Sequence, residues 1–116
     1  DSVADVVGGF HFLRAHAGEI GIDPGKIVIV GESAGGHLAV MASLLLQPGL
    51  VKAVVGLWGI QDMRLGHASA ISRNWPGAYE MFCSGTPDTA GGCYHNMTTT
   101  THVSLASPPM LLLHGM

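Results

Sequence analysis

The sequence predicts an α/β fold, in the form of a partial doubly wound parallel sheet with a sharp strand-to-helix turn. The β-branched residues at 27–30 predict a short buried strand. The run Ala34–Leu46 contains no proline and is rich in Ala, Leu and Met, which predicts a helix. A second strand is predicted at Lys52–Trp58. Strand, helix and strand within about 35 residues indicate a right-handed βαβ crossover.

The composition indicates the middle of a larger core. Of the 116 residues, 47% are hydrophobic and 11% are charged, so we expect strands that are buried on both faces. A net charge of −3 provides no electrostatic footprint for nucleic acid or for a membrane surface, and neither is expected as a partner. The longest apolar run, Leu38–Leu46, is too short to span a bilayer. A cytoplasmic and a secreted location are both compatible with the sequence, and the oligomeric state stays open as well.

The first predicted element is an amphipathic helix over Asp1–Ala17. Its apolar residues recur at spacings of three and four, so they would share one face. Gly18 and Gly21 are suitable stops for this helix, and the turn at 23–25 (DPG) leads into the first strand.

The turn after that strand, Gly31–Gly35, reads GESAG, a G-x-S-x-G pattern in which Glu32 and Ala34 take the variable places. Between a strand and a helix, this pattern predicts a nucleophile elbow. We expect the two glycines of the pattern to avoid collisions within the turn, and Gly36 to let the helix pack close to the sheet. A chance Gly/Ser turn is the alternative, and the flanking strand and helix argue against it.

Ser33 is the predicted catalytic nucleophile of this elbow. Its hydroxyl would lie at the N-terminus of a helix, where the helix dipole and free backbone N–H groups favour developing negative charge. The N–H of Ala34 is the predicted oxyanion-hole donor. His37 lies on the same helix and is expected to pack against the fold, so it is not expected to act as the base.

The stretch Gly21–Ala39 (GIDPGKIVIVGESAGGHLA) resembles the α/β-hydrolase superfamily. It is most similar to carboxylesterases of the hormone-sensitive-lipase and feruloyl-esterase-like groups. Ala15–Pro24 is similar to their helix-to-strand approach, and Ser107–Gly115 (SPPMLLLHG) is similar to the strand that leads to their catalytic acid. The resemblance spans nearly the whole chain and is weakest between Leu65 and Thr101.

The resemblance implies a serine carboxylesterase that acts on a small-molecule ester and uses neither a cofactor nor a metal. In this superfamily the acid and the histidine follow the serine in chain order, the acid within a few residues of an HG such as 114–115. We therefore expect residues 1–116 to be the central portion of a single domain, truncated at both ends, with little or no activity alone. His114 is expected to be structural.

Two other classes of function stay open at this point. One is a non-catalytic domain of the same fold that serves in binding. The other is a serine peptidase of the prolyl-oligopeptidase type, although those enzymes usually carry an aromatic residue where this chain has Ala34.

Trp58 and Asp62 are candidates for lining the pocket. They follow the second strand, and binding sites of doubly wound sheets lie at the carboxyl ends of the strands. Some α/β-hydrolases place the triad acid after this strand, which gives Asp62 a second interpretation. We prefer the alternative that Asp62 caps a helix or bonds to its own loop.

Residues 65–101 show no clear hydrophobic period. A helix is expected within 69–82, with an interruption at Trp75–Gly77, and the resemblance implies an insertion that shapes specificity. Cys83 and Cys93 flank a loop that would close as a disulfide, and both the disulfide and free thiols stay open. A zinc site that adds His95 and His102 is disfavoured. The last predicted element is a strand at Met110–Leu113.

Overall fold

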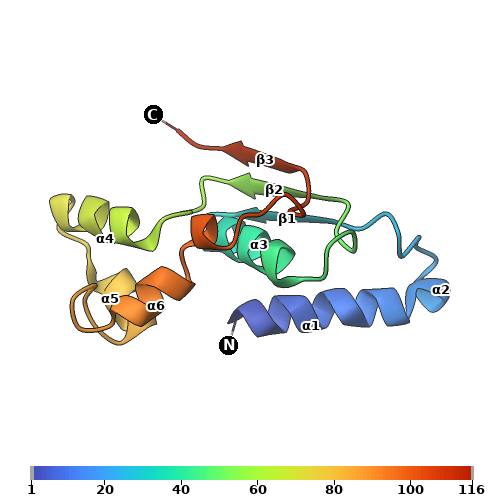
Figure 1. Cartoon of the computed structure of the whole chain (residues 1–116), viewed down its shortest axis with the longest axis horizontal. Coiled ribbons are helices and arrows are strands. Elements are labelled where there is room, and N and C mark those ends of the chain that lie inside the picture. Colours follow the sequence, from blue (N-terminus) through green and yellow to red (C-terminus); the bar gives the residue numbers. More distant parts are fainter. Residues whose placement is uncertain (1, 116) are drawn as a thin grey trace. The chain divides into compact units, whose positions relative to one another are not determined.

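The structure is a computed structural model that describes residues 2–115, and the chain divides into two compact units. The first unit contains the chain up to Gly59 and again from Val103 onward, and the second contains Ile60–His102. The second unit is therefore an insertion between two strands of the first. The labels of Figure 1 are used for helices and strands in both units.

The first unit begins with two helices, α1 (Ser2–Ala15) and α2 (Ala17–Ile20). The predicted helix is confirmed over most of its length, and its first residue lies outside the described residues. It ends two residues earlier than predicted because His16 leaves the helical conformation, with φ −104° and ψ 16°. Of the two predicted stops, Gly21 is confirmed as the end of the short α2, with φ 78°, whereas Gly18 is wrong because it lies within α2.

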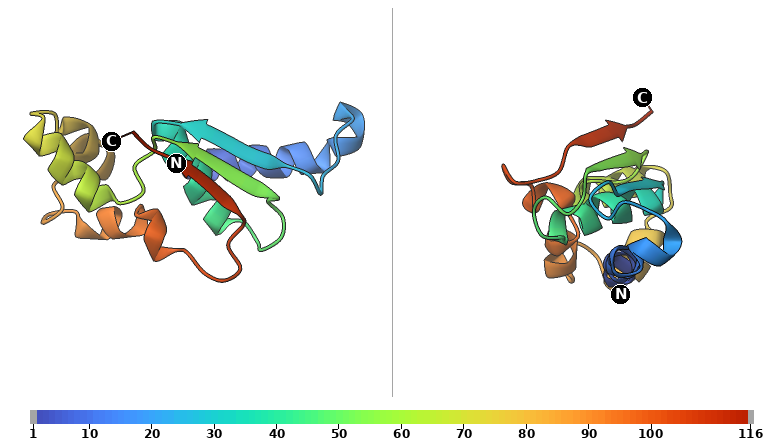
Figure 2. Two further views of the ribbon diagram at one scale, coloured as in Figure 1. Left: turned by 90° about the horizontal axis from the view of Figure 1, so that it is seen from above. Right: turned by 90° about the vertical axis from the view of Figure 1, so that its right-hand side faces the viewer.

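The sheet of the first unit has three parallel strands in the order β1 (Val28–Glu32), β2 (Ala53–Leu57) and β3 (Met110–Leu113). Helix α3 (Ala34–Leu45) connects β1 to β2, which confirms the predicted βαβ unit. Strand β1 ends two residues later than predicted because residues 31 and 32 still pair with residues 56 and 57 of β2. Figure 2 shows the three strands side by side.

Helix α3 covers one face of this sheet. Val54 of β2 is fully buried and packs with Ala39 and Val40 of α3. The helix approaches closely at Gly56, where an added Cβ would lie 3.1 Å from the Val40 Cγ2 atom. Phe10 of α1 packs in a second apolar cluster with Leu46, directly after α3, and Val51, two residues before β2. Figures 1 and 2 show both helices on the same side of the sheet.

Within the first unit, no described residues cover the other face of the sheet. Strand pairing places Val28 and Val30 of β1 and Leu111 and Leu113 of β3 on this face, with exposed fractions of 46%, 62%, 52% and 51%. Among the described residues the expectation of strands buried on both faces is met on one face only, and for a larger core it stays a prediction. The physical reason is that α1 and α3 pack on the same side.

The second unit consists of short helices: α4 (Met63–Ser72), α5 (Gly77–Cys83), α6 (Gly91–Asn96) and the 3₁₀ turn η1 (Thr99–Thr101). The expected helical segment within 69–82, with an interruption, is confirmed in outline as α4 and α5. Its bounds differ, because α4 already begins at Met63 and the break falls at residues 73–76. The apolar core of this unit is built around Met63, Cys83 and Tyr94, which no local period in the sequence reveals.

Cys83 at the end of α5 forms a disulfide with Cys93 in α6, with 5.6 Å between their Cα atoms. Of the two alternatives, disulfide or free thiols, the structure thus has the disulfide. Neither cysteine is then available as a thiolate ligand for the zinc site, which the sequence already disfavoured. Both cysteines belong to the core cluster of the second unit.

We expect this disulfide to be the largest single contribution to the stability of the second unit. Replacing both cysteines by serine should lower the stability of α5 and α6 by about 3 kcal/mol, because the cross-link closes a loop of ten residues in the unfolded chain. Amide hydrogen exchange of the two helices measures this loss. A dithiol reductant added to the unchanged protein should reproduce the effect. Equal protection of α5 and α6 with and without the disulfide would contradict the expectation.

Candidate active site

Ser33 lies in the tight turn between β1 and α3, with φ 53° and ψ −124°. A positive φ is uncommon for a residue with a side chain and costs on the order of 1–3 kcal/mol. Such strain is found where the surrounding structure enforces it, most often at functional sites. The backbone at Ser33 therefore has the strained conformation that a nucleophile elbow requires.

Hydrogen bonds on both sides hold this turn. The Ser33 N–H donates to the carbonyl oxygen of Leu57 in β2 at 2.9 Å, which extends the β1–β2 pairing by one bond. The Ser33 carbonyl accepts from the N–H of His37 at 3.2 Å, which is the first bond of α3. Ser33 is thus connected to the sheet through its N–H and to the helix through its C=O.

The glycines around Ser33 have different roles. A Cβ at Gly31 would collide with the backbone carbonyl of Gly35 and would lie 2.9 Å from the N of Gly36. A Cβ at Gly36 would lie 2.8 Å from the Leu57 carbonyl oxygen, so this glycine lets α3 meet the sheet, as expected. A Cβ at Gly35 would meet nothing within 4 Å. The expectation that Gly35 is needed to avoid a side-chain collision is therefore wrong. The backbone carbonyl of Gly35 lies close to Gly31, but a side chain at Gly35 would meet no neighbour.

The Ser33 side chain is exposed and makes no capping hydrogen bond to α3, although Ser33 occupies the N-cap position. Ala34 is the first residue of α3 and is also exposed. The N–H groups in the first turn of a helix have no partner within the helix, so they are suited to stabilise a negative charge. Glu32 is the last residue of β1 and is exposed beside this turn. His37 is buried on α3, as expected.

Trp58 is the residue directly after β2, and its side chain is 51% exposed. Its N–H donates to the carbonyl oxygen of Leu113 in β3 at 2.6 Å. Because the three strands are parallel, Ser33 and Trp58 follow the carboxyl ends of neighbouring strands. The structure therefore brings Trp58 and the elbow to the same edge of the sheet.

Asp62 lies in the second unit, where it caps α4. Its Oδ1 accepts hydrogen bonds from the N–H groups of Arg64 at 2.9 Å and Leu65 at 3.0 Å. The preferred interpretation as a helix cap is confirmed, since these two bonds satisfy N–H groups of the first turn. The interpretation of Asp62 as a pocket residue stays a prediction.

The capping role of Asp62 makes a prediction with a built-in control. Replacing Asp62 by alanine should lower the stability of the second unit by about 1 kcal/mol, whereas asparagine, which also caps helices, should retain most of it. Thermal unfolding measures both.

If Asp62 were the triad acid, replacing it by asparagine would lower kcat by about 10⁴-fold. Because Asp62 caps a helix instead, we expect the kcat of the Asp62→Asn variant to stay within about tenfold of that of the unsubstituted protein. A loss of about 10⁴-fold in kcat would instead support Asp62 as the triad acid.

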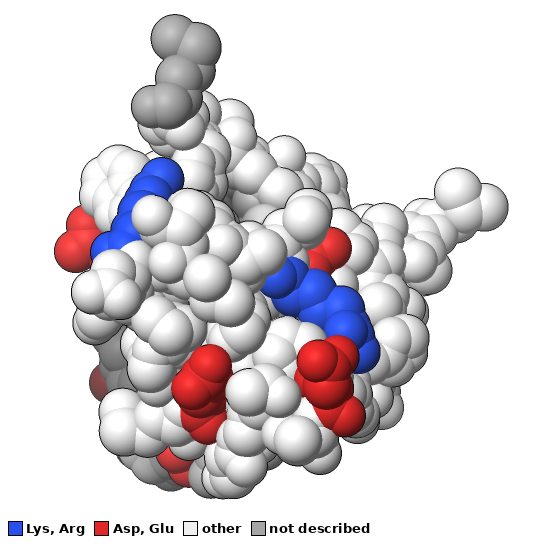
Figure 3. Space-filling view, turned by 90° about the vertical axis from the view of Figure 1, so that its left-hand side faces the viewer, with Lys and Arg blue, Asp and Glu red and all other residues white. Residues whose placement is uncertain are grey.

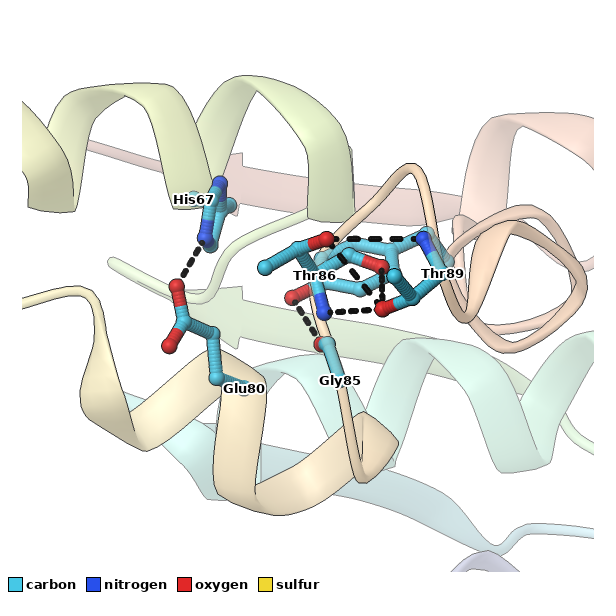
Figure 4. Close-up of polar contacts among 6 residues, drawn as sticks. His67, Glu80, Gly85, Thr86 and Thr89 are labelled. Atoms are coloured by element: carbon cyan, nitrogen blue, oxygen red, sulfur yellow. Dashed lines mark hydrogen bonds and ion pairs between the residues drawn. The ribbon is translucent and has the colours of Figure 1, made fainter.

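A partly buried polar pair in the second unit was missed by sequence reasoning. His67 of α4 is buried, and its Nε2 lies 2.9 Å from the Oε1 of Glu80 in α5 (Figure 4). The Tyr94 ring meets the His67 ring edge-on, and the Tyr94 hydroxyl donates to the Gly85 carbonyl at 3.1 Å. Burial raises the pKa of Tyr94, and the negative charge of Glu80 acts in the same direction. These contacts join separate helices and leave no periodic signal in the sequence.

The surface carries few charges. On the face drawn in Figure 3, the basic side chains in view lie beside acidic ones. Among the described residues, no group of three or more His, Cys, Asp or Glu is arranged to hold a metal ion. In the same part of the chain, no helix has both the length and the apolar character needed to cross a bilayer.

A parallel sheet in which one strand turns into a helix at an exposed, strained serine is the arrangement of the α/β-hydrolase fold. Comparison with known proteins identifies the family within this class. The BD-FAE family profile matches residues 1–116, and the chain belongs to this family. A probable carboxylic ester hydrolase of Mycobacterium tuberculosis, LipM, is 33% identical over 127 aligned residues. The alignment covers 99% of this chain and 29% of LipM.

Solved structures share the fold. A truncated form of a carbohydrate esterase from gut microbiota matches with a TM-score of 0.77 and 23% identity, over 97% of this chain and 48% of the other. Thermogutta terrifontis esterase 2 matches with a TM-score of 0.63 and 25% identity, over 97% of this chain and 40% of the other. The chain thus spans less than a third of LipM and less than half of either solved chain.

Proposed function

We propose that the protein containing this chain hydrolyses small-molecule carboxylic esters through an acyl-enzyme formed on Ser33. The observation that carries the proposal is the exposed Ser33 hydroxyl at a strained strand-to-helix turn, free of any capping bond to α3. Membership of the BD-FAE family and the similarity to a probable carboxylic ester hydrolase support the same class of reaction.

The reaction has two steps. In the first, the Ser33 Oγ attacks the ester carbonyl carbon while a histidine base takes the hydroxyl proton, and the carbonyl oxygen becomes an oxyanion. The N–H of Ala34 and the N-terminus of α3 stabilise this charge. The C–O bond to the alcohol then breaks, and the histidine returns the proton to the leaving oxygen. In the second step, water attacks the acyl group by the same route and releases the acid and Ser33.

We further propose that the histidine base and the carboxylate that orients it lie in segments beyond residue 116. The proposal follows the chain order of this superfamily, in which acid and histidine come after the serine. The His37 side chain is buried on α3, and the His114 Nδ1 lies 3.0 Å from the Gly115 carbonyl oxygen. Residues 1–116 would then form the central portion of one domain and have little activity by themselves.

Hydrolysis assays on the full-length protein test this function. We expect turnover of p-nitrophenyl acetate and p-nitrophenyl butyrate, and at most trace cleavage of a dipeptide p-nitroanilide. Preferential cleavage of the anilide would indicate the peptidase class instead. A folded full-length protein that cleaves none of the three substrates would favour a non-catalytic binding domain and would contradict the proposal.

A further inference from the structure

Residues 96–98 of the second unit read Asn-Met-Thr and have no part in the proposed ester site. This is the Asn-x-Thr pattern of an N-glycosylation acceptor, in which the middle residue is not proline. Such a short pattern also occurs by chance, so it does not by itself make Asn96 a modified residue. Two observations from the structure, the environment of Asn96 and the nearby disulfide, favour modification.

The environment of Asn96 explains its backbone but not its side chain. Asn96 is exposed and is the last residue of α6, and its carbonyl oxygen lies 2.8 Å from the Nε2 atom of His102. Asparagine is a poor helix former, and at a helix end it usually adopts the left-handed conformation. Asn96 keeps a helical backbone instead, and Met97 follows the helix with φ −95° and ψ 1°. The fold therefore gives no reason for an amide side chain at this exposed position.

The Cys83–Cys93 disulfide is close to Asn96 in the chain, because Cys93 and Asn96 both belong to α6. Disulfides form and persist in oxidising environments, among them the lumen of the endoplasmic reticulum. Asn-x-Thr acceptors are used on the surface of secreted proteins, which pass through that lumen. The disulfide and the acceptor pattern are independent features, and both are typical of the same compartment.

Thr98 determines when a glycan could be attached. The Thr98 side chain is buried, and its Oγ1 donates to the Tyr94 carbonyl at 2.7 Å and accepts from the Met63 N–H at 3.1 Å. The acceptor pattern requires the hydroxyl of this residue as well as the asparagine amide. An enzyme that must reach both groups is therefore excluded once the second unit has folded. Attachment has to precede folding, after which the exposed position of Asn96 leaves the bulky glycan in solvent.

We propose that Asn96 is an N-glycosylation site and is modified before the second unit folds. The donor is an oligosaccharide that is linked to a polyprenyl lipid through a diphosphate. The Asn96 Nδ2 forms a C–N bond to the anomeric carbon of the first sugar, and the amide releases one proton to solvent. The C–O bond to the diphosphate breaks, and the lipid diphosphate leaves with that electron pair. The proposal is independent of ester hydrolysis, and it places the full-length protein in the secretory pathway of a eukaryotic cell.

The test produces the full-length protein in the secretory pathway of cultured eukaryotic cells. Peptide N-glycosidase removes N-glycans and converts the asparagine that carried them to aspartate, which takes up a heavy-oxygen label from labelled water. Mass spectrometry of the peptide that contains α6 should show this label at Asn96. Asn74 is the internal control, since it is also exposed but is followed by Trp75 and Pro76. It should carry no label.

Three variants test the site and the order of events. Asn96→Gln moves the amide by one methylene and should abolish the glycan, whereas Thr98→Ser keeps a hydroxyl and should retain it. Replacing both Cys83 and Cys93 by serine should leave the glycosylated fraction equal or higher, because a less stable second unit leaves the acceptor accessible for longer.

Two results would overturn the proposal. An unmodified Asn96 in secreted protein that contains the Cys83–Cys93 disulfide would contradict the glycosylation site. Efficient transfer of the oligosaccharide onto the already folded full-length protein, by purified transferase and the lipid-linked donor, would contradict modification before folding. Neither result would affect the proposal of ester hydrolysis, which the assays with p-nitrophenyl esters test separately.

Discussion

Replacing Ser33 by alanine in the full-length protein is expected to lower kcat for ester hydrolysis by a factor on the order of 10⁶. The substitution removes the only atom that forms the covalent bond to the acyl group in the proposed mechanism. The fold should persist, because the hydrogen bonds that hold the turn use the backbone N–H and C=O of this residue. A steady-state assay with p-nitrophenyl butyrate measures the loss.

Two further variants separate chemistry from folding in this prediction. Ser33→Gly should be as inactive as Ser33→Ala but about 1 kcal/mol more stable, because glycine accepts φ 53° without strain. Ser43→Ala on the same helix is the matched control, since the Ser43 hydroxyl is buried and donates to the Val40 carbonyl. It should retain full kcat. Retention of more than about 1% of kcat by either Ser33 variant would contradict the role of this serine.

Replacing Gly31 by alanine is the substitution with the largest expected effect on stability. The added Cβ would collide with the carbonyl group of Gly35 and would lie 2.9 Å from the N of Gly36. All of these neighbours are backbone atoms at the start of α3, so no flexible side chain can move aside. We expect a loss of about 3 kcal/mol or more, since overpacking a rigid site costs about 1–3 kcal/mol and a displaced turn adds to that cost. Chemical denaturation of the full-length protein measures it.

Gly35→Ala is the matched control for this prediction. An added Cβ at Gly35 meets nothing within 4 Å, and alanine favours the helix that begins at Ala34. We expect stability to stay the same or to rise by up to about 1 kcal/mol. Equal destabilisation by the two substitutions would show that the backbone of the turn is not held as described.

The local sequence was sufficient to predict the βαβ unit and the elbow. The β-branched run before Gly31 and the Ala- and Leu-rich run after Ser33 each have a composition typical of the element that they form. The start of α3 follows from the G-x-S-x-G pattern, whose meaning depends on the flanking strand and helix, whereas β1 continues two residues further than predicted. The later strand β3 was also predicted, because a short apolar run directly follows two prolines.

Other features depend on contacts that no local pattern contains. The second unit is held by Tyr94 in its core, by the Cys83–Cys93 disulfide and by the pairing of His67 with Glu80, which join helices of only six to ten residues. Burial of the sheet was predicted from composition, which does not specify the side on which the helices pack. The positive φ of Trp58, directly after β2 where α3 approaches closely, also has no signal in the sequence.

The role of Ser33 as a nucleophile is tested most directly by covalent labelling. A fluorophosphonate probe phosphonylates a serine only where the surrounding site activates its hydroxyl. After treatment of the full-length protein and proteolysis, mass spectrometry of the peptide that contains the elbow should show one probe per molecule, attached to Ser33, and the Ser33→Ala variant should remain unlabelled. An unlabelled Ser33 in a folded protein that hydrolyses esters, or a probe attached to a different serine, would contradict the account.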